Sequence, residues 1–128
     1  MSMIERQNAQ PGRSQDSRSW AKVMQGLRAD YMRNSAANLD AIGRLIELME
    51  GRPSAEALRF LLARFHGLNG SGLTYGFPEV SLLGARGEEK CRVVLQGGGT
   101  ASAGDFATWR SLLDGLHREL APRTTLRH

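Results

Sequence analysis

Apolar residues recur at three- and four-residue steps in four separate stretches of this 128-residue chain. Such spacing places them on one face of an α-helix, and no stretch shows the strict alternation of a half-buried β-strand. The stretches predict helices over residues 20–51, 54–76, 78–96 and 105–120, the first of them as one helix or two in line. Amphipathic helices with short connections predict an all-α fold, an antiparallel up-down four-helix bundle with an N-terminal helical extension.

Residues with special backbone or capping properties mark the ends of these predicted helices. Ser54 is a suitable N-cap because its hydroxyl can accept a hydrogen bond from a free backbone N–H group. Gly76 and Pro78 fit the end of one helix and the start of the next. Residues 97–99 are all glycine and predict a flexible loop, after which Asp105 can open the last helix.

The third predicted helix is the least regular of the four. Gly84 and Gly87 lie inside it, and glycine in a helix interior weakens the helix. Its apolar positions still keep a helical spacing and are expected to face the core, namely Val80, Leu83, Cys91 and Val94.

The length of the chain corresponds to a single domain. Residues 1–18 are rich in Gln, Ser, Asn and Arg, so they predict a disordered tail before a bundle at residues 19–122 and a C-terminal tail at 123–128. No run of eighteen apolar residues and no signal-type N-terminus is present, so we expect a cytoplasmic protein without a membrane partner. The single cysteine, Cys91, excludes an intramolecular disulfide.

The formal net charge is +4, and fifteen of the seventeen cationic residues are Arg. Arginine favours forked contacts to carboxylate or phosphate, although a compositional drift toward Arg explains the same count. The excess of positive charge is too mild to require nucleic acid. The four Trp and Tyr residues that could stack on bases are mostly in core register, namely Trp20, Tyr31, Tyr75 and Trp109.

His66 lies among residues with very small side chains, at the edge of the apolar face of the second predicted helix. Gly67, Gly70 and Gly72 follow it, and each glycine inside a helix costs about 1 kcal/mol relative to alanine. A lone histidine at the edge of a core is usually structural. The surrounding glycines instead favour close approach of another molecule to the imidazole ring.

The stretch from Phe65 to Pro78 resembles the histidine phosphotransfer (HPt) domain pattern. In that pattern a phosphorylatable His is followed by x-Leu-Lys-Gly-Ser and, a few residues later, by another Gly. The matching residues here are His66, Leu68, Gly70, Ser71 and Gly76, and Asn69 replaces the usual lysine.

The resemblance implies a phosphoryl carrier without kinase activity of its own, in which His66 exchanges phosphate with a response-regulator receiver domain. It implies a monomer that binds no cofactor, because the receiver supplies Mg²⁺, and a hybrid sensor histidine kinase is a further partner. Glu88 takes the position of the residue that hydrogen-bonds the imidazole, although a solvated surface carboxylate is the alternative. The remaining expected site residues are the phosphoryl neighbours Asn69, Gly70, Arg59 and Arg92 and the docking residues Gly67 and Leu73.

Asn69 also supports a rival interpretation. An amide can donate a hydrogen bond to phosphate but lacks the charge that strengthens such bonds. The alternative is therefore an HPt-like interaction module that binds a receiver or kinase without transferring phosphate.

Overall fold

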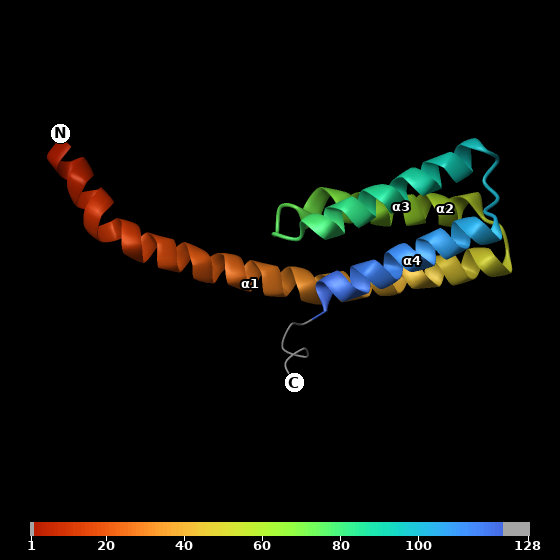
Figure 1. Ribbon diagram of the computed structural model, residues 1–128, viewed down its shortest axis with the longest axis horizontal. Helices are drawn as coiled ribbons and strands as arrows, with labels where there is room; N and C mark the ends of the chain where they lie inside the picture. Colours follow the sequence, from red (N-terminus) through yellow and green to blue (C-terminus); the bar gives the residue numbers. More distant parts are fainter. Residues whose placement is uncertain (1, 122–128) are drawn as a thin grey trace.

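Four α-helices make up the part of the chain that the computed structural model describes, the backbone of residues 2–121 and the side chains of residues 17–121. The helices are α1 (Ser2–Gly51), α2 (Ala55–Gly72), α3 (Pro78–Gln96) and α4 (Ala103–Leu120). They run alternately up and down and pack side by side over the C-terminal half of α1, while the N-terminal half of α1 projects beyond the bundle (Figure 1). No β-strand occurs in residues 2–121, so the prediction of an all-α four-helix bundle with a helical extension is confirmed.

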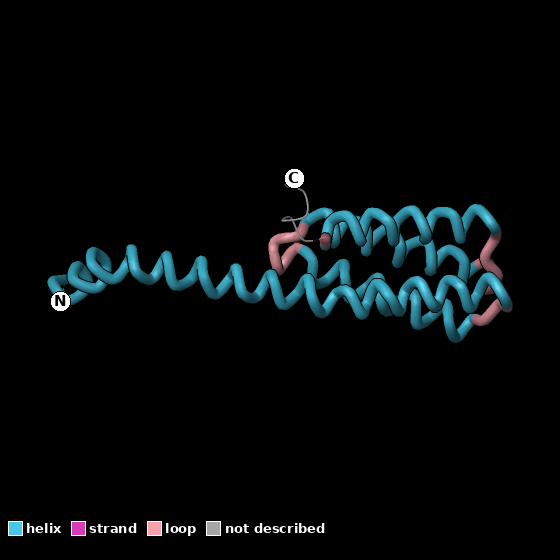
Figure 2. The backbone as a smooth tube through the Cα atoms, turned by 90° about the horizontal axis from the view of Figure 1, so that it is seen from below, coloured by secondary structure: helices cyan, strands magenta, loops and turns pink. Residues whose placement is uncertain are grey.

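The core is built from the apolar stripes that the sequence periodicity predicts. The largest fully buried side chains come from all four helices and include Ile42, Ile46, Leu61, Phe65, Val80, Cys91, Trp109 and Leu116. Burial of this apolar surface is the main force that holds the helices together. The two ends of the bundle are closed by the short connections seen in Figure 2.

α1 is one continuous helix, and it departs from the predicted organisation at its N-terminus. The sequence predicts a disordered tail over residues 1–18, whereas the backbone of residues 2–18 is helical. Adding residues to an existing helix costs less than nucleating one, so the packed half of α1 can propagate a helix into this polar segment. Pro11 lies within the segment and cannot donate the backbone hydrogen bond of a regular helix. The predicted tail at residues 123–128 and the bundle boundary at residue 122 lie outside the described residues.

Between residue 17 and the start of the bundle, the apolar side chains of α1 are not in the core, in contrast to the core register predicted for Trp20. The exposed fractions are 64 % for Trp20, 49 % for Val23 and 39 % for Leu27, and Met24 is partly buried. We call these four residues the α1 ledge. Their helical spacing is correct, but the N-terminal part of α1 projects beyond the other three helices (Figures 1 and 2).

The start of α2 agrees with the sequence prediction, whereas the start of α4 differs from it. The Ser54 hydroxyl accepts from the Ala57 backbone nitrogen at 3.0 Å, as predicted for an N-cap. α4 begins at Ala103 and not at Asp105, because Ser102 and Asp105 form a capping box in which each side chain accepts from the other's backbone N–H.

α2 ends at Gly72, four residues before the predicted end. The Ser81 hydroxyl accepts from the Leu73 backbone nitrogen at 2.7 Å and donates to the Asn69 carbonyl at 2.8 Å, which ties the end of α2 to α3. The chain then turns through Gly76, whose φ of +88° is a conformation that glycine adopts without strain.

The glycines of α3 allow α2 and α3 to approach closely. A Cβ atom at Gly84 would lie 2.6 Å from the Asn69 nitrogen and 2.8 Å from the Phe65 carbonyl oxygen, and one at Gly87 would overlap the Phe65 ring. The expectation that these glycines only weaken α3 is therefore incomplete, since they permit the contact that positions the site described next.

Candidate functional site

Three side chains converge on the carboxylate of Glu88, which projects from α3 toward α2. The Nδ1 atom of His66 lies 2.9 Å from Glu88 Oε2, and Asn69 Nδ2 donates to Glu88 Oε1 at 3.3 Å. Arg92, one turn further along α3, forms an ion pair with Glu88 Oε2. We call these four residues the His66 cluster.

The charged side chain of Glu88 is buried, unlike an ordinary surface carboxylate. Its side chain is 5 % exposed, so the alternative of a solvated surface carboxylate is wrong. Burial raises the pKa of Glu88, but the hydrogen bonds from His66, Asn69 and Arg92 and the charge of Arg92 outweigh it, and the pKa lies below its ordinary value. The carboxylate is thus ionised at neutral pH.

An ionised carboxylate can only accept hydrogen bonds, so the Nδ1 atom of His66 must be the donor. The neutral imidazole is then fixed in the tautomer that leaves the Nε2 lone pair free. The His66 side chain is 68 % exposed, and among the described residues Nε2 has no hydrogen-bond partner. A buried anion therefore orients an imidazole ring that is largely exposed to solvent.

The surface next to His66 is open. A Cβ atom added at Gly67 or Gly70 would meet no other atom within 4 Å, so packing within the described chain does not require glycine at either position. Leu73, just beyond the end of α2, is 67 % exposed. Arg59 is also exposed, two helical turns before His66, but it is not among the partners of Glu88.

The structure thus brings together four of the residues expected from the sequence. Asn69 and Arg92, which are expected beside the phosphoryl group, are both hydrogen-bonded to Glu88. The four-residue spacing of Glu88 and Arg92 on one helix is the sequence signal that could have indicated their ion pair.

Ser71 is a partly buried residue of α2 whose side chain is hydrogen-bonded on two sides. Its hydroxyl donates to the Gly67 carbonyl at 2.8 Å and lies 2.8 Å from the Tyr31 hydroxyl of α1. It therefore links the His66 segment of α2 to the first helix.

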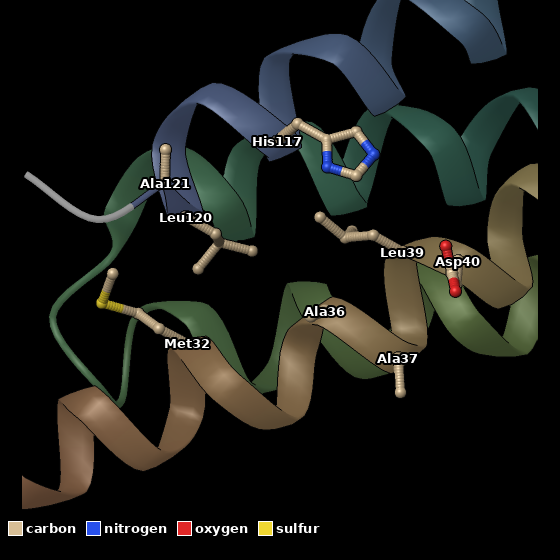
Figure 3. Close-up of a pocket in the computed structure, with 8 residues that line it drawn as sticks. All are labelled: Met32, Ala36, Ala37, Leu39, Asp40, His117, Leu120 and Ala121. Carbon is tan, nitrogen blue, oxygen red and sulfur yellow. The ribbon is translucent and has the colours of Figure 1, made fainter. Parts of the chain in front are cut away.

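Two other reactive side chains, His117 and Cys91, are not part of this cluster. His117 lines a separate groove of about 440 Å³ between α1 and α4, opposite Leu39 and Asp40 (Figure 3). Cys91 is fully buried, and burial raises the pKa of its thiol to about 12. Within the described residues, no three His, Cys, Asp or Glu side chains are grouped so that they could hold a metal ion.

Comparisons with models of known protein families, with curated proteins and with solved structures found no match. None of the helices described here combines the length and the apolar character needed to cross a membrane.

Replacing Glu88 with glutamine is expected to make the free energy of unfolding depend less on pH in the acidic range. Because the pKa of Glu88 is lowered in the folded protein, its contribution is present above the unfolded-state pKa and is lost as the pH falls through the folded-state pKa. The wild type should exceed Glu88→Gln by about 1–3 kcal/mol in free energy of unfolding at pH 7. That difference should shrink as the pH falls below 4.5, the ordinary value for the group.

Urea denaturation of both proteins between pH 7 and pH 3 measures this difference. Glu89→Gln is the matched control, because Glu89 is adjacent but 68 % exposed and should leave the profile nearly unchanged. A difference between wild type and Glu88→Gln that stays constant down to pH 3 would contradict the ionised, hydrogen-bonded state of Glu88.

Proposed function

We propose that this protein is a histidine phosphotransfer carrier that exchanges a phosphoryl group with receiver domains in a two-component phosphorelay. The observation that carries the proposal is the exposed imidazole of His66, held at Nδ1 by the buried Glu88 carboxylate. A fixed tautomer with one free nitrogen is what a phosphoryl acceptor requires.

The transfer would follow from the geometry of the His66 ring. The Nε2 lone pair attacks the phosphorus of an aspartyl phosphate, the P–N bond forms, and the bond from phosphorus to the aspartate oxygen breaks with its electron pair leaving on the carboxylate. The proton stays on Nδ1, where the negative charge of Glu88 stabilises the cationic phosphoimidazole. The receiver supplies the acidic pocket and the Mg²⁺ ion.

The open surface at Gly67 and Gly70 supports this proposal, because an in-line displacement needs the receiver to approach the ring closely. Leu73 adds an exposed apolar contact at the edge of that surface. Arg92 is 48 % exposed and is the cation of the His66 cluster that could turn from Glu88 to phosphoryl oxygens. We propose that the carrier acts as a cytoplasmic monomer, with a hybrid sensor histidine kinase as a second partner.

The direct test mixes the purified protein with phosphorylated receiver domains encoded in the same genome. The expected product is an acid-labile, base-stable phosphate that peptide mapping places on His66. Label on a serine or on His117 would contradict the assignment.

An interaction module that binds a receiver without transfer is the second candidate, and one contact favours it. Asn69 occupies the position of the lysine in the HPt pattern, and its amide is turned to Glu88. Without a cation at this position, the cluster has fewer charges with which to stabilise the transferring phosphoryl group.

Asn69→Lys is expected to speed phosphotransfer by about tenfold, which corresponds to about 1.4 kcal/mol of transition-state stabilisation. The added ammonium can reach the phosphoryl oxygens while receiver affinity changes little. Rapid-quench transfer from a phosphorylated receiver measures the rate. Asn69→Met is the control for loss of the amide hydrogen bond without gain of charge.

If Asn69→Lys is no faster and Arg92→Gln is slow, Arg92 is the cation of the site. If neither wild type nor Asn69→Lys accepts phosphate from a receiver that binds, the interaction module replaces the carrier.

A further inference from the structure

Tyr31 lies one helical turn after Leu27 of the α1 ledge, and unlike the ledge it packs against the core. Its hydroxyl oxygen is 2.8 Å from the hydroxyl oxygen of Ser71 on α2. Ser71 has a single hydroxyl proton and donates it to the Gly67 carbonyl at 2.8 Å, so Tyr31 must be the donor to Ser71. A directed chain of two hydrogen bonds therefore runs from α1 to the residue that follows His66.

Aromatic packing holds the ring of Tyr31 in this orientation. The ring stacks on those of Tyr75 and Phe77, with centroids 4.8 and 5.5 Å apart. The Arg28 guanidinium lies over the Phe77 ring, 4.8 Å from its centroid. Because aromatic pairs prefer a defined geometry, these contacts direct the Tyr31 hydroxyl to Ser71 independently of the hydrogen bond itself.

The segment that Tyr31 reaches is the part of α2 with the weakest intrinsic preference for a helix. Gly67, Gly70 and Gly72 each cost about 1 kcal/mol relative to alanine. The side chain of Ser71 adds to this, because a serine that bonds the carbonyl four residues before it slightly weakens and bends a helix. Residues 67–72 therefore depend on contacts with other helices to remain helical.

Two side chains from outside α2 supply such contacts. From α3, the Ser81 hydroxyl donates to the Asn69 carbonyl and accepts from the Leu73 backbone nitrogen. From α1, the Tyr31 hydroxyl donates to Ser71. The exposed glycines and Leu73 of the same segment form the open surface beside the imidazole. The shape of that surface thus depends on an anchor in α3 and an anchor in α1.

We propose that Tyr31 is a positioning residue for receiver docking, which acts through Ser71 to keep residues 67–73 in the form that a receiver meets. This inference rests on the proposed function, because the docking surface is that of the phosphotransfer site. Without the Tyr31 hydroxyl, receiver binding must order the segment itself, and this cost lowers receiver affinity. The contact between His66 and Glu88 does not involve Tyr31, so the chemistry at a saturating receiver concentration is unaffected.

Tyr31→Phe tests the inference, because it removes the hydroxyl and keeps the aromatic ring. Tyr75→Phe is the matched control, since Tyr75 belongs to the same stack and its hydroxyl has no hydrogen-bond partner among the described residues. Hydrogen exchange of individual amide groups is followed by NMR in the full chain. Tyr31→Phe is expected to speed exchange in residues 70–76 by about two- to tenfold, the effect of one lost hydrogen bond, and Tyr75→Phe should match the wild type.

The second measurement separates docking from chemistry. A phosphorylated receiver domain that labels His66 is titrated against each protein in single-turnover phosphotransfer. For Tyr31→Phe, the receiver concentration that gives half the maximal rate should rise at least about threefold, whereas the maximal rate should change by less than about twofold. In a Ser71→Ala background, Tyr31→Phe should have no further effect, because the two residues act through one hydrogen bond.

Several outcomes would overturn the inference. Equal exchange in wild type and Tyr31→Phe, or the same acceleration in Tyr75→Phe, would remove the Tyr31 hydroxyl as an anchor. Faster exchange with an unchanged half-saturating receiver concentration would leave Tyr31 a purely structural role, and a loss confined to the maximal rate would assign it to the chemistry. If receivers bind the wild type without labelling it, the proposed transfer is wrong, and calorimetric dissociation constants of wild type and Tyr31→Phe still decide the role of Tyr31.

Discussion

Gly84→Ala is expected to destabilise the bundle by about 1–3 kcal/mol, the usual cost of overpacking a close contact. Alanine is the better helix former, so intrinsic propensity alone predicts the opposite sign. The added Cβ would lie 2.6 Å from the Asn69 nitrogen and 2.8 Å from the Phe65 carbonyl oxygen. Both are backbone atoms of α2 that cannot rotate away, so α2 and α3 must separate.

Gly70→Ala is the matched control for this substitution. Its Cβ would meet nothing within 4 Å, so it is expected to stabilise the protein by up to about 1 kcal/mol through helix propensity. Urea denaturation at pH 7 compares the two variants with the wild type. Equal stability of Gly84→Ala and wild type would show that α2 and α3 do not approach as closely as described.

The separation caused by Gly84→Ala also has a consequence at the His66 cluster. His66 lies on α2 and Glu88 on α3, so the 2.9 Å contact between them depends on the spacing of these two helices. We therefore expect Gly84→Ala to loosen the imidazole as well as the bundle, whereas Gly70→Ala should not.

Much of this fold could be predicted from the sequence, because each helix has a continuous apolar stripe and a recognisable start. Ser54 and Pro78 begin α2 and α3 as expected. The end of α2 could not be located, since Gly72 and Gly76 are both suitable and the choice depends on the contact between Ser81 and Asn69 across the turn.

The buried stripe of α3 was harder to recognise, because two of its members have no side chain. Val80, Gly84, Gly87, Glu88, Cys91 and Val94 are all buried and follow one helical face. Glycine contributes no hydrophobic signal, and a charged residue on the stripe looks like an interruption. The burial of Glu88 follows from the close approach of α2, which is a property of the packed pair of helices.

The periodicity of apolar residues also does not show whether an apolar stripe is covered by another helix of the bundle. Trp20 and Leu27 belong to the same apolar stripe of α1 as the buried Ile42 and Ile46, yet they are exposed in the part of α1 that projects beyond the bundle. The lengths of α2, α3 and α4 decide how far along α1 the core extends.

His66→Gln is expected to reduce phosphotransfer by at least about a thousandfold, to the background of the assay, because an amide nitrogen has no nucleophilic lone pair. The fold should be retained, since the His66 side chain is 68 % exposed and the glutamine amide can still donate to Glu88. The measurement is acid-labile phosphate transferred from a phosphorylated receiver, alongside circular dichroism of the variant.

His117→Gln is the control for this substitution, because His117 is an exposed histidine of the same chain in a separate groove. It should transfer at the wild-type rate. If His66→Gln still accepts phosphate, or if His117→Gln alone loses it, the role assigned to the His66 cluster is wrong. If His66→Gln binds the receiver as tightly as wild type but transfers nothing, docking and chemistry are separable. In that case Glu88 serves the chemistry, since its buried carboxylate orients the ring.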